Sequence, residues 1–401
     1  MGEIDEMETI QLASEIECTG CTACYSVCPN NCIKMNGDSF GFPRPVIDKA
    51  QCVKCGLCQN ACPVVQKRSF TTIDGIRTYA AYSKDENIRY TSSSGGIFSE
   101  IAISVLDQGG VIWGAAYDAS FAVRHIAVES RDELHKLQGA KYSQSELGDA
   151  FSQIKQQLIR GRQVLFCGSP CQVYGLKGFL TKEYDNLICV DFVCHSIPSP
   201  YAWKKYLDYR SKSDSPGEHP SSINMRSKIT GWSHYGYSVL IDYEHEKYMA
   251  RSNQDLYMKL FVGGYISRSS CANCKFKGFE RASDLTIGDC WGVWNFAPQM
   301  DDDKGTSLVI VHTEKGNEFF LGISDRINTL PISKKEALES NKAISNSQKV
   351  SADRNKSLKM AVTGKYTLLE QMLKNKTRVK TAKDTIKKAL TVLNKGRTNY
   401  E

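Results

Sequence analysis

Eight cysteines near the start of the chain repeat one spacing twice. The pattern C-x-x-C-x-x-C-x-x-x-C-P spans residues 18–29 and again residues 52–63. Three thiolates at this spacing hold three corners of a 4Fe-4S cubane, and the fourth, which precedes a proline, reaches the other cluster. The pattern predicts one cluster on Cys18, Cys21, Cys24 and Cys62 and a second on Cys28, Cys52, Cys55 and Cys58. Zinc is the alternative, but a zinc site uses two C-x-x-C pairs and needs no third cysteine at the same interval.

The composition fits a globular protein that binds metal. The chain has 401 residues, 41% of them hydrophobic, which is enough for two or three domains with real cores. Its sixteen cysteines would not persist as disulfides in a reducing compartment, so metal binding is the economical explanation. No apolar run reaches the ~18 residues that a membrane span needs, and the first ten residues are acidic, unlike a secretion signal. We therefore expect a cytoplasmic protein.

Basic residues are concentrated at the C-terminal end. Residues 331–401 hold 17 of the 51 Lys and Arg but 6 of the 44 Asp and Glu, which leaves 34 against 38 in the rest of the chain. From about Tyr366, Leu and Val recur at helical spacing among lysines, which predicts an amphipathic helix. We favour a solvated helix packed on the body over one that docks an acidic partner or an anionic membrane surface. Nucleic acid is not an expected partner, because the basic residues are not interleaved with aromatics and no binding motif occurs.

The segments around and after the cysteine repeats predict the elements that position them. Between the repeats, Gly and Pro turn signals and short alternating runs predict a small hairpin. From about Arg77 to Arg326, apolar runs such as VIWGAAY, QVLFCG and NLICVDFVC alternate with helical stretches. This alternation predicts an α/β fold. We expect an α/β (α+β) multi-domain chain with a ferredoxin-type domain over 1–68, a body over 77–326 and a basic helical tail over 327–401.

Two turns of the predicted body lie where α/β sheets bind ligands. Before one helix stand the loop residues Ser92, Ser93, Ser94, Gly95 and Gly96. A helix N-terminus offers free N–H groups to a phosphate, although a serine N-cap with glycines for a tight entry is the ordinary explanation. In VLFCGSPCQ, the strand is followed by Gly168, Ser169 and Cys171. A cysteine at a helix start has a lowered pKa, which suits a nucleophile or a metal thiolate.

Four remote cysteines stand at strand ends and turns of the body, namely Cys171, Cys194, Cys271 and Cys274. A single C-x-x-C such as CANC is half of a zinc site or a redox dithiol as readily as half of a cluster. Four such cysteines can nevertheless converge on one metal. By contrast, we interpret Cys32, Cys167 and Cys189 as packed thiols.

Five motifs follow one another in the body: GAKYSQS, GSPCQ, DFVCHSIPSP, CANCKFKGFERASDLTIGDCWGV and TSLVIVHTEKGNEFF. With them, roughly residues 77–322 resemble the coenzyme F420 hydrogenase/dehydrogenase beta-subunit family. The resemblance implies a flavoprotein that binds FAD and a 4Fe-4S cluster of its own, and members with a fused two-cluster ferredoxin segment are familiar. Relatives include beta subunits of deazaflavin-reducing hydrogenases and formate dehydrogenases, and the plant reductase of 7-hydroxymethyl chlorophyll. Others accompany surface-polysaccharide genes where the deazaflavin is not made, so the substrate is not inherited with the family name.

The resemblance also assigns roles to particular residues. It implies that Cys171, Cys194, Cys271 and Cys274 hold a third 4Fe-4S cluster. It implies FAD contacts from Ser92, Ser93, Ser94, Gly95, Gly96, Lys141, Tyr142 and Ser143, and the strand-end position adds Gly168 and Ser169. A departure is Cys290, where many relatives have an aromatic residue between TIGD and WG. Cys290 is therefore an alternative ligand of the third cluster.

These features predict an FAD-dependent iron–sulfur oxidoreductase. Clusters exchange one electron at a time whereas hydride chemistry takes two, and a flavin stores the first electron. The expected partners are a redox protein and a small organic acceptor or the deazaflavin coenzyme F420. Two candidate catalytic residues are Lys141, as a cation near the reduced flavin, and His195, as a proton donor; the alternatives are a solvated lysine and a histidine that supports the cluster or packs.

Two other functions compete with this prediction. One is a non-catalytic subunit that relays electrons to a partner enzyme, for example in surface-polysaccharide metabolism. The other keeps the fold but places zinc, rather than a cluster, on the body cysteines.

Overall fold

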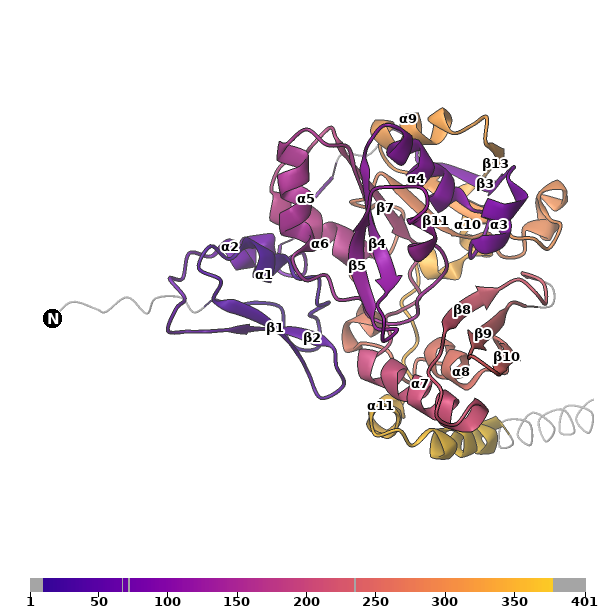
Figure 1. Ribbon diagram of the computed structural model, residues 1–401. Helices are drawn as coiled ribbons and strands as arrows, with labels where there is room; N and C mark the ends of the chain where they lie inside the picture. The colour runs from indigo at the N-terminus through magenta and orange to yellow at the C-terminus, as the bar shows by residue number, and fades with distance from the viewer. Residues whose placement is uncertain (1–9, 67, 71–72, 234–235, 378–401) are drawn as a thin grey trace, which may run out of the picture.

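The computed structural model describes residues 10–66, 68–70, 73–233 and 236–377 (Figure 1). The cysteine repeats form a small lobe on one side of a larger α/β body (Figure 1). This arrangement confirms the predicted fold class. None of the helices within the described ranges is both long enough and apolar enough to cross a membrane.

The small lobe contains two copies of a turn and a short helix. α1 (Ala23–Val27) begins after Thr22, whose φ is 64°, and α2 (Leu57–Ala61) begins after Gly56, whose φ is 75°. Each helix ends at the last cysteine of its repeat, in extended conformation. The left-handed residue reverses the chain direction within each repeat, which allows closely spaced thiols to face one point. β1 (Ile33–Gly37) and β2 (Pro43–Ile47) pair antiparallel between the repeats, which confirms the predicted hairpin.

An eight-stranded mixed sheet forms the centre of the body, in the order β13-β3-β12-β11-β7-β6-β4-β5. The neighbours β4, β6, β7 and β11 are parallel, and every other neighbouring pair is antiparallel. The carboxyl ends of the four parallel strands therefore meet at one edge. The strands are β3 (Arg77–Ser83), β4 (Val111–Tyr117), β5 (Val123–Val128), β6 (Val164–Gly168), β7 (Leu187–Phe192), β11 (Leu285–Asp289), β12 (Ser307–Val311) and β13 (Ile327–Ile332).

Helices cover both faces of this sheet (Figure 1). α4 (Ile97–Asp107) and α9 (Glu314–Gly322) share one apolar core with the sheet, while α5 (Ala150–Ile159) and α6 (Pro170–Leu180) share the other. Along β6, for example, Leu165 packs into the first core while Val164 and Phe166 pack into the second. Parallel strands that are buried on both faces form continuous apolar runs, which is why they were visible in the sequence.

A second, three-stranded antiparallel sheet lies beside the main one (Figure 1). It consists of β8 (Ser222–Ser227), β9 (Ser238–Asp242) and β10 (Lys247–Arg251), and it shares a core with α7 (Pro200–Asp214), α8 (Leu256–Val262) and α11 (Arg354–Val362). That core is rich in aromatic side chains, including Trp203, Tyr206 and Tyr257. This sheet was not predicted from the sequence, because β8 and β10 are short and largely polar.

The C-terminal part begins within the main sheet. β13 falls in the range predicted as tail, yet it pairs with β3 over its whole length, so the body extends to Ile332. α10 (Lys334–Ser340) and α11 follow, and residues 366–377 are helical. Tyr366 and Leu369 are buried in the core of α7 and α11, and the Tyr366 hydroxyl donates to the Ala202 carbonyl at 2.5 Å. The predicted amphipathic helix thus packs on the body as far as residue 377, and its remainder lies outside the described residues.

Candidate functional site

The four cysteines predicted to hold the first cluster lie close together. Cys18, Cys21 and Cys24 come from the first repeat, and Cys62 comes from the end of the second. Burial, together with the neighbouring thiolates of Cys18 and Cys62, raises the pKa of Cys21 well above its ordinary value and that of Cys24 to about 12. Buried, mutually repelling thiolates need a compensating positive charge, so this donor set fits an iron–sulfur core.

The cysteines predicted to hold the second cluster line one cavity, together with Cys32. The Cys32 Sγ lies 3.3 Å from the Sγ of the predicted ligand Cys28, so its thiol can donate a hydrogen bond to that sulfur. Cys55 is exposed, so this site reaches the surface of the protein.

Within the ranges that the structure covers, no three His, Cys, Asp or Glu side chains form a group suited to a single metal ion.

The four remote cysteines of the body also come together. Cys171 at the start of α6, Cys194 after β7, and the pair Cys271 and Cys274 line a cavity of about 150 Å³. Burial, with a smaller contribution from the Cys274 thiolate, raises the pKa of Cys171 to about 12 and that of Cys271 to about 11. The lowered pKa expected for Cys171 at a helix start is therefore wrong, because the cost of burying the thiolate is the larger effect. The Ile197 N–H donates to the Cys271 Sγ at 3.4 Å. The tertiary structure thus assembles the predicted ligand set from three separate segments.

The surroundings of Arg281 and Cys290 indicate how a cluster would fit in this cavity. The buried Arg281 lines it; its Nη1 lies 3.6 Å from the Asp191 carboxylate, and neither Nη atom has a hydrogen-bond partner among the described residues. Unpartnered buried N–H groups are costly, so they favour an acceptor such as a cluster sulfide in the cavity. Cys290, the alternative ligand, packs instead against Ala80, Val293 and Met300 in a different core. The geometry therefore favours Cys171 over Cys290.

A larger cavity of about 450 Å³ lies at the carboxyl ends of the parallel strands. Its volume is in the range typical of cofactor sites. Its wall includes nearly all the residues predicted to contact FAD or to act in catalysis, namely Ser92, Ser93, Ser94, Gly96, Lys141, Tyr142, Ser143, Gly168, Ser169 and His195. Gly95 is the exception, because it packs against β3 and β12: a Cβ there would lie 2.4 Å from the Ala81 carbonyl oxygen.

The Ser92–Gly96 loop, which joins α3 (Glu86–Thr91) to α4, is held from the side of the second sheet. The Ser93 carbonyl accepts from Arg226 Nη2 at 3.0 Å and from Trp232 Nε1 at 3.2 Å, and the Ser94 carbonyl accepts from Lys228 Nζ at 2.6 Å. Within the part of the chain that the structure describes, no side chain caps the first turn of α4. Its N–H groups therefore remain available to an anion.

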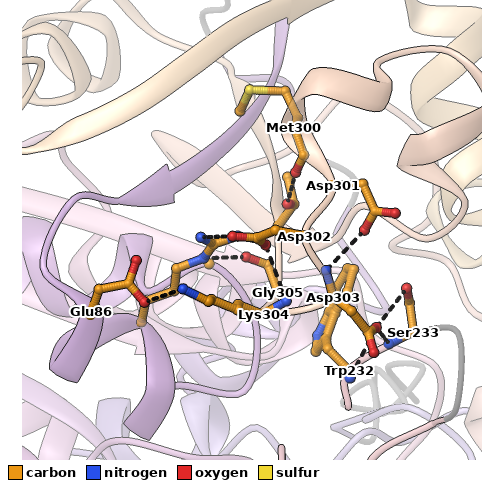
Figure 2. Close-up of polar contacts among 12 residues, drawn as sticks. Glu86, Trp232, Ser233, Met300, Asp301, Asp302, Asp303, Lys304 and Gly305 are labelled. Atoms are coloured by element: carbon orange, nitrogen blue, oxygen red, sulfur yellow. Dashed lines mark hydrogen bonds and ion pairs between the residues drawn. The ribbon is translucent and has the colours of Figure 1, made fainter.

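The segment from Met300 to Gly305 fixes the same region (Figure 2). Asp303 accepts from the Trp232 and Ser233 N–H groups at 3.1 and 2.7 Å, and Lys304 forms an ion pair with Glu86 at 2.9 Å (Figure 2). Asp302 forms two hydrogen bonds with the buried Arg89 of α3. This segment thus ties α3 to the connection between β8 and β9, which stabilises the loop.

Several residues on the wall of the large cavity were missed by the sequence analysis. They are His125, Cys167, Arg226, Tyr237, Asp289 and Trp291. Arg226 and Tyr237 belong to the second sheet or its connections, and isolated polar residues in short strands carry no spacing signal. The motif TIGDCWG does contain Asp289 and Trp291, and it was the one signal available.

The cavity wall carries buried polar atoms without partners. Arg226 Nε and His125 Nδ1 form no hydrogen bond within the described structure. Burial lowers the pKa of His125 to about 4, so its ring is neutral, and its Nε2 lies 3.1 Å from the Cys167 carbonyl oxygen. Because unpartnered buried polar groups are costly, these atoms fit a polar ligand such as the flavin ring or its phosphates.

Lys141 and His195, the predicted catalytic residues, both face this cavity. Lys141 Nζ donates to the Gln138 carbonyl at 2.7 Å, and burial lowers the pKa of Lys141 to about 7. His195 Nε2 lies 3.0 Å from Gln348 Nε2, and burial lowers the pKa of His195. A lysine with a pKa near neutrality can both release and take up a proton at physiological pH.

Cys171 lines both the large cavity and the cavity of the four body cysteines. Thr19 and Ile197 line both as well. The two cavities therefore share a wall, and one predicted cluster ligand forms part of it.

The small lobe docks on α6 through two glycines. A Cβ at Gly175 would lie 2.9 Å from the Cys21 Sγ, and a Cβ at Gly178 would lie 2.4 Å from the Ala61 carbonyl oxygen. Because a larger side chain would collide with the Cys21 side chain at Gly175 and with the Ala61 backbone at Gly178, the two glycines permit the close approach of the small lobe to α6. α6, which carries Cys171 at its start, thus contacts the first ligand set directly.

The fold and the cysteine sites define an iron–sulfur electron-transfer protein with an α/β body. Models of the coenzyme F420 hydrogenase/dehydrogenase beta subunit match residues 78–152 with the N-terminal part and residues 161–335 with the C-terminal part. A 4Fe-4S dicluster domain matches residues 17–65. The chain belongs to the coenzyme F420 hydrogenase/dehydrogenase beta-subunit family and carries a fused dicluster domain.

Individual relatives are distant. An uncharacterized protein of Methanocaldococcus jannaschii is 22% identical over 355 residues, which cover 76% of this chain and 85% of that one. NADH-quinone oxidoreductase subunit I of Pelobacter propionicus is 33% identical over 63 residues, 14% of this chain and 34% of that one. A chain of the F420-reducing [NiFe] hydrogenase complex from Methanosarcina barkeri superimposes with a TM-score of 0.43 and 16% identity, over 77% of this chain and 94% of that chain.

Proposed function

We propose that the protein is an FAD-dependent iron–sulfur oxidoreductase. In this proposal the small lobe holds two 4Fe-4S clusters, the four body cysteines hold a third, and FAD binds in the large cavity. The acceptor is a small organic molecule or coenzyme F420. The observation that carries the proposal is the wall shared by the two cavities, because Cys171 would then be a cluster ligand that also faces the flavin.

The residues of the large cavity supply complementary binding groups. The uncapped first turn of α4 and the hydroxyls of Ser92, Ser93 and Ser94 would bind the phosphates of FAD. Arg226 Nε offers a further donor on the opposite element. FAD, when bound, exchanges single electrons with clusters and electron pairs with an organic acceptor.

In this proposal, Lys141 is the residue that donates and accepts the proton. Its pKa, lowered by burial to about 7, allows Nζ to hold a proton for an anionic group in the cavity and to release it near neutral pH. His195 is the second candidate, but burial lowers its pKa and keeps the ring neutral at pH 7. A neutral His195 serves better as a hydrogen-bond partner beside Cys194 than as the proton donor.

The second cluster is the proposed entry point for electrons from a redox partner. Cys55 is exposed, and next to it Val53 and Leu57 are 64% and 42% exposed. Exposed apolar side chains around a cofactor favour transient protein contact. The path would then run from the second cluster through the first and the body cluster to the large cavity.

Anaerobic purification with iron, sulfide and flavin analysis tests the proposal. Three clusters require about twelve irons per chain, so twelve irons and one FAD support it. About eight irons without flavin would instead identify an electron relay with two clusters. Zinc that resists iron chelation would show that the body cysteines bind zinc. The reduced holoprotein is then mixed with oxidised F420. If the holoprotein does not reduce F420 although its flavin is intact, the acceptor is a different molecule.

A further inference from the structure

The guanidinium of Arg268 is buried between the small lobe and the body. Its exposed fraction is 1%. Its Nε donates to the Cys18 carbonyl at 2.7 Å and its Nη2 to the Pro43 carbonyl at 2.9 Å, while Nη1 donates to Gln144 Oε1 at 2.8 Å. Nη2 also lies 3.7 Å from the Sγ of Cys18, a predicted ligand of the first cluster. Arg268 thus joins residues 250 positions apart in the sequence.

Arg268 also faces the predicted ligands of the body cluster. It lines the same cavity as Cys171, Cys194, Cys271 and Cys274. Its charge interacts electrostatically with the thiolates of Cys18, Cys271 and Cys171, which belong to two different ligand sets. The Arg268 guanidinium therefore lies between the two ligand sets.

No carboxylate of the described residues pairs with the Arg268 guanidinium. These Arg268 hydrogen bonds go to neutral carbonyl or amide oxygens or to sulfur, and among the described residues no Asp or Glu forms an ion pair with Arg268. A buried cation without an anion is costly. The thiolates, and the net negative charge of a cluster with four cysteine ligands, supply the missing counter-charge on both sides.

Arg281 lines the same cavity but differs from Arg268 in its charge partner. Arg281 Nη1 lies 3.6 Å from the buried carboxylate of Asp191, so its charge is already partly neutralised. Arg281 contacts the body site alone, whereas Arg268 contacts both. Arg268 is therefore placed to affect the two clusters together.

We propose that Arg268 is a shared positioning residue for the first cluster and the body cluster, which fixes their mutual placement and raises the reduction potential of both. The inference rests on the proposed third cluster. Reduction adds an electron to a cluster, and a nearby cation stabilises the added charge more strongly in a low-dielectric interior than in water. Because Arg268 would raise the reduction potentials of both clusters together, the two potentials would stay close enough for electron transfer between the clusters.

Redox titration of the holoprotein, followed by EPR, tests this role. In Arg268→Gln, we expect the equilibrium constant for reduction of each cluster to fall about tenfold, which is a shift of about −59 mV for a one-electron couple. Arg268→Lys keeps the charge and should recover most of the shift. Arg160→Gln removes an exposed arginine and should leave both potentials unchanged.

A second variant keeps the arginine and covers the case in which Arg268→Gln does not fold. Gln144→Glu places a carboxylate on Arg268 Nη1 and should lower both potentials in the same direction. Full iron content with unchanged potentials in both variants would overturn the inference, and so would a shift confined to one cluster. Eight irons in the unmodified protein would instead refute the third cluster, which separates failure of the proposed function from failure of the role of Arg268.

Discussion

Arg226 and Asp289 form a two-point ion pair on the wall of the large cavity, with Nη1–Oδ2 and Nη2–Oδ1 distances of 2.9 and 2.8 Å. Arg226 comes from the second sheet and Asp289 from the end of β11 in the main sheet. The pair therefore joins the two sheets at the site. Arg226 also lies over the rings of Tyr237 and Trp291, at 4.1 and 5.1 Å from their centroids.

Asp289→Asn should destabilise the protein markedly. The substitution leaves the Arg226 charge buried without its anion, which costs about 3–5 kcal/mol for a buried pair. Urea unfolding of flavin-free protein, followed by fluorescence, measures the change. Asp208→Asn is the matched control, because its pair with Lys205 is exposed and should contribute less than about 1 kcal/mol. Equal midpoints for the two variants would contradict the importance of the Arg226–Asp289 pair.

In the proposed FAD site, Lys141 should make cofactor binding depend on pH. Below a pKa of about 7 the side chain already carries its proton, whereas above that pH an anionic ligand must bind together with a proton. FAD affinity should therefore fall with rising pH above about 7, by up to about tenfold per unit. Equilibrium dialysis between pH 6 and pH 9 measures it.

Two substitutions isolate the contribution of Lys141 to this pH dependence. Lys141→Met should remove the pH dependence. Lys141→Arg should keep the affinity for FAD high and constant across this pH range, because arginine stays charged. The exposed Lys136 offers the control, since Lys136→Met should preserve the unmodified profile. An unaltered pH profile in Lys141→Met would show that another group titrates.

Cys171→Ser should remove the proposed third cluster alone. Loss of one thiolate from the four-cysteine cavity should reduce the iron content from about twelve to about eight, since each cubane holds four irons. Cys290→Ser is the control, because Cys290 packs in a separate core and should leave the iron content intact. Iron analysis and EPR of the reduced proteins distinguish the two. Full iron in Cys171→Ser, or loss in Cys290→Ser, would reassign the ligand.

Gly178→Ala should weaken the docking of the small lobe. The added Cβ would lie 2.4 Å from the Ala61 carbonyl oxygen, so α2 must move, at a cost of about 1–3 kcal/mol. Gly322 provides the control at the end of α9, because a Cβ there meets nothing within 4 Å and alanine should be neutral or stabilising by up to about 1 kcal/mol. Thermal unfolding under anaerobic conditions compares them. A Gly178→Ala protein as stable as Gly322→Ala would show that the contact is not tight.

The sequence by itself determined the local cysteine chemistry. Cys18, Cys21 and Cys24 are separated by two residues each, and such short intervals restrict where the thiols can lie whatever the rest of the chain does. The buried parallel strands were predictable for the same reason, because burial on both faces requires a continuous apolar run. The five motifs of the body and their order were enough to indicate the coenzyme F420 hydrogenase/dehydrogenase beta-subunit family.

Only the tertiary structure decided which distant groups meet. The convergence of Cys171, Cys194 and Cys271, the close approach at Gly178, and the ion pair of Arg226 with Asp289 all depend on how sheets and helices pack. Arg268 is the clearest case, because nothing near it in the chain reveals that Cys18 lies against its guanidinium. Packing brings these groups together across long sequence separations, and no local spacing records such contacts.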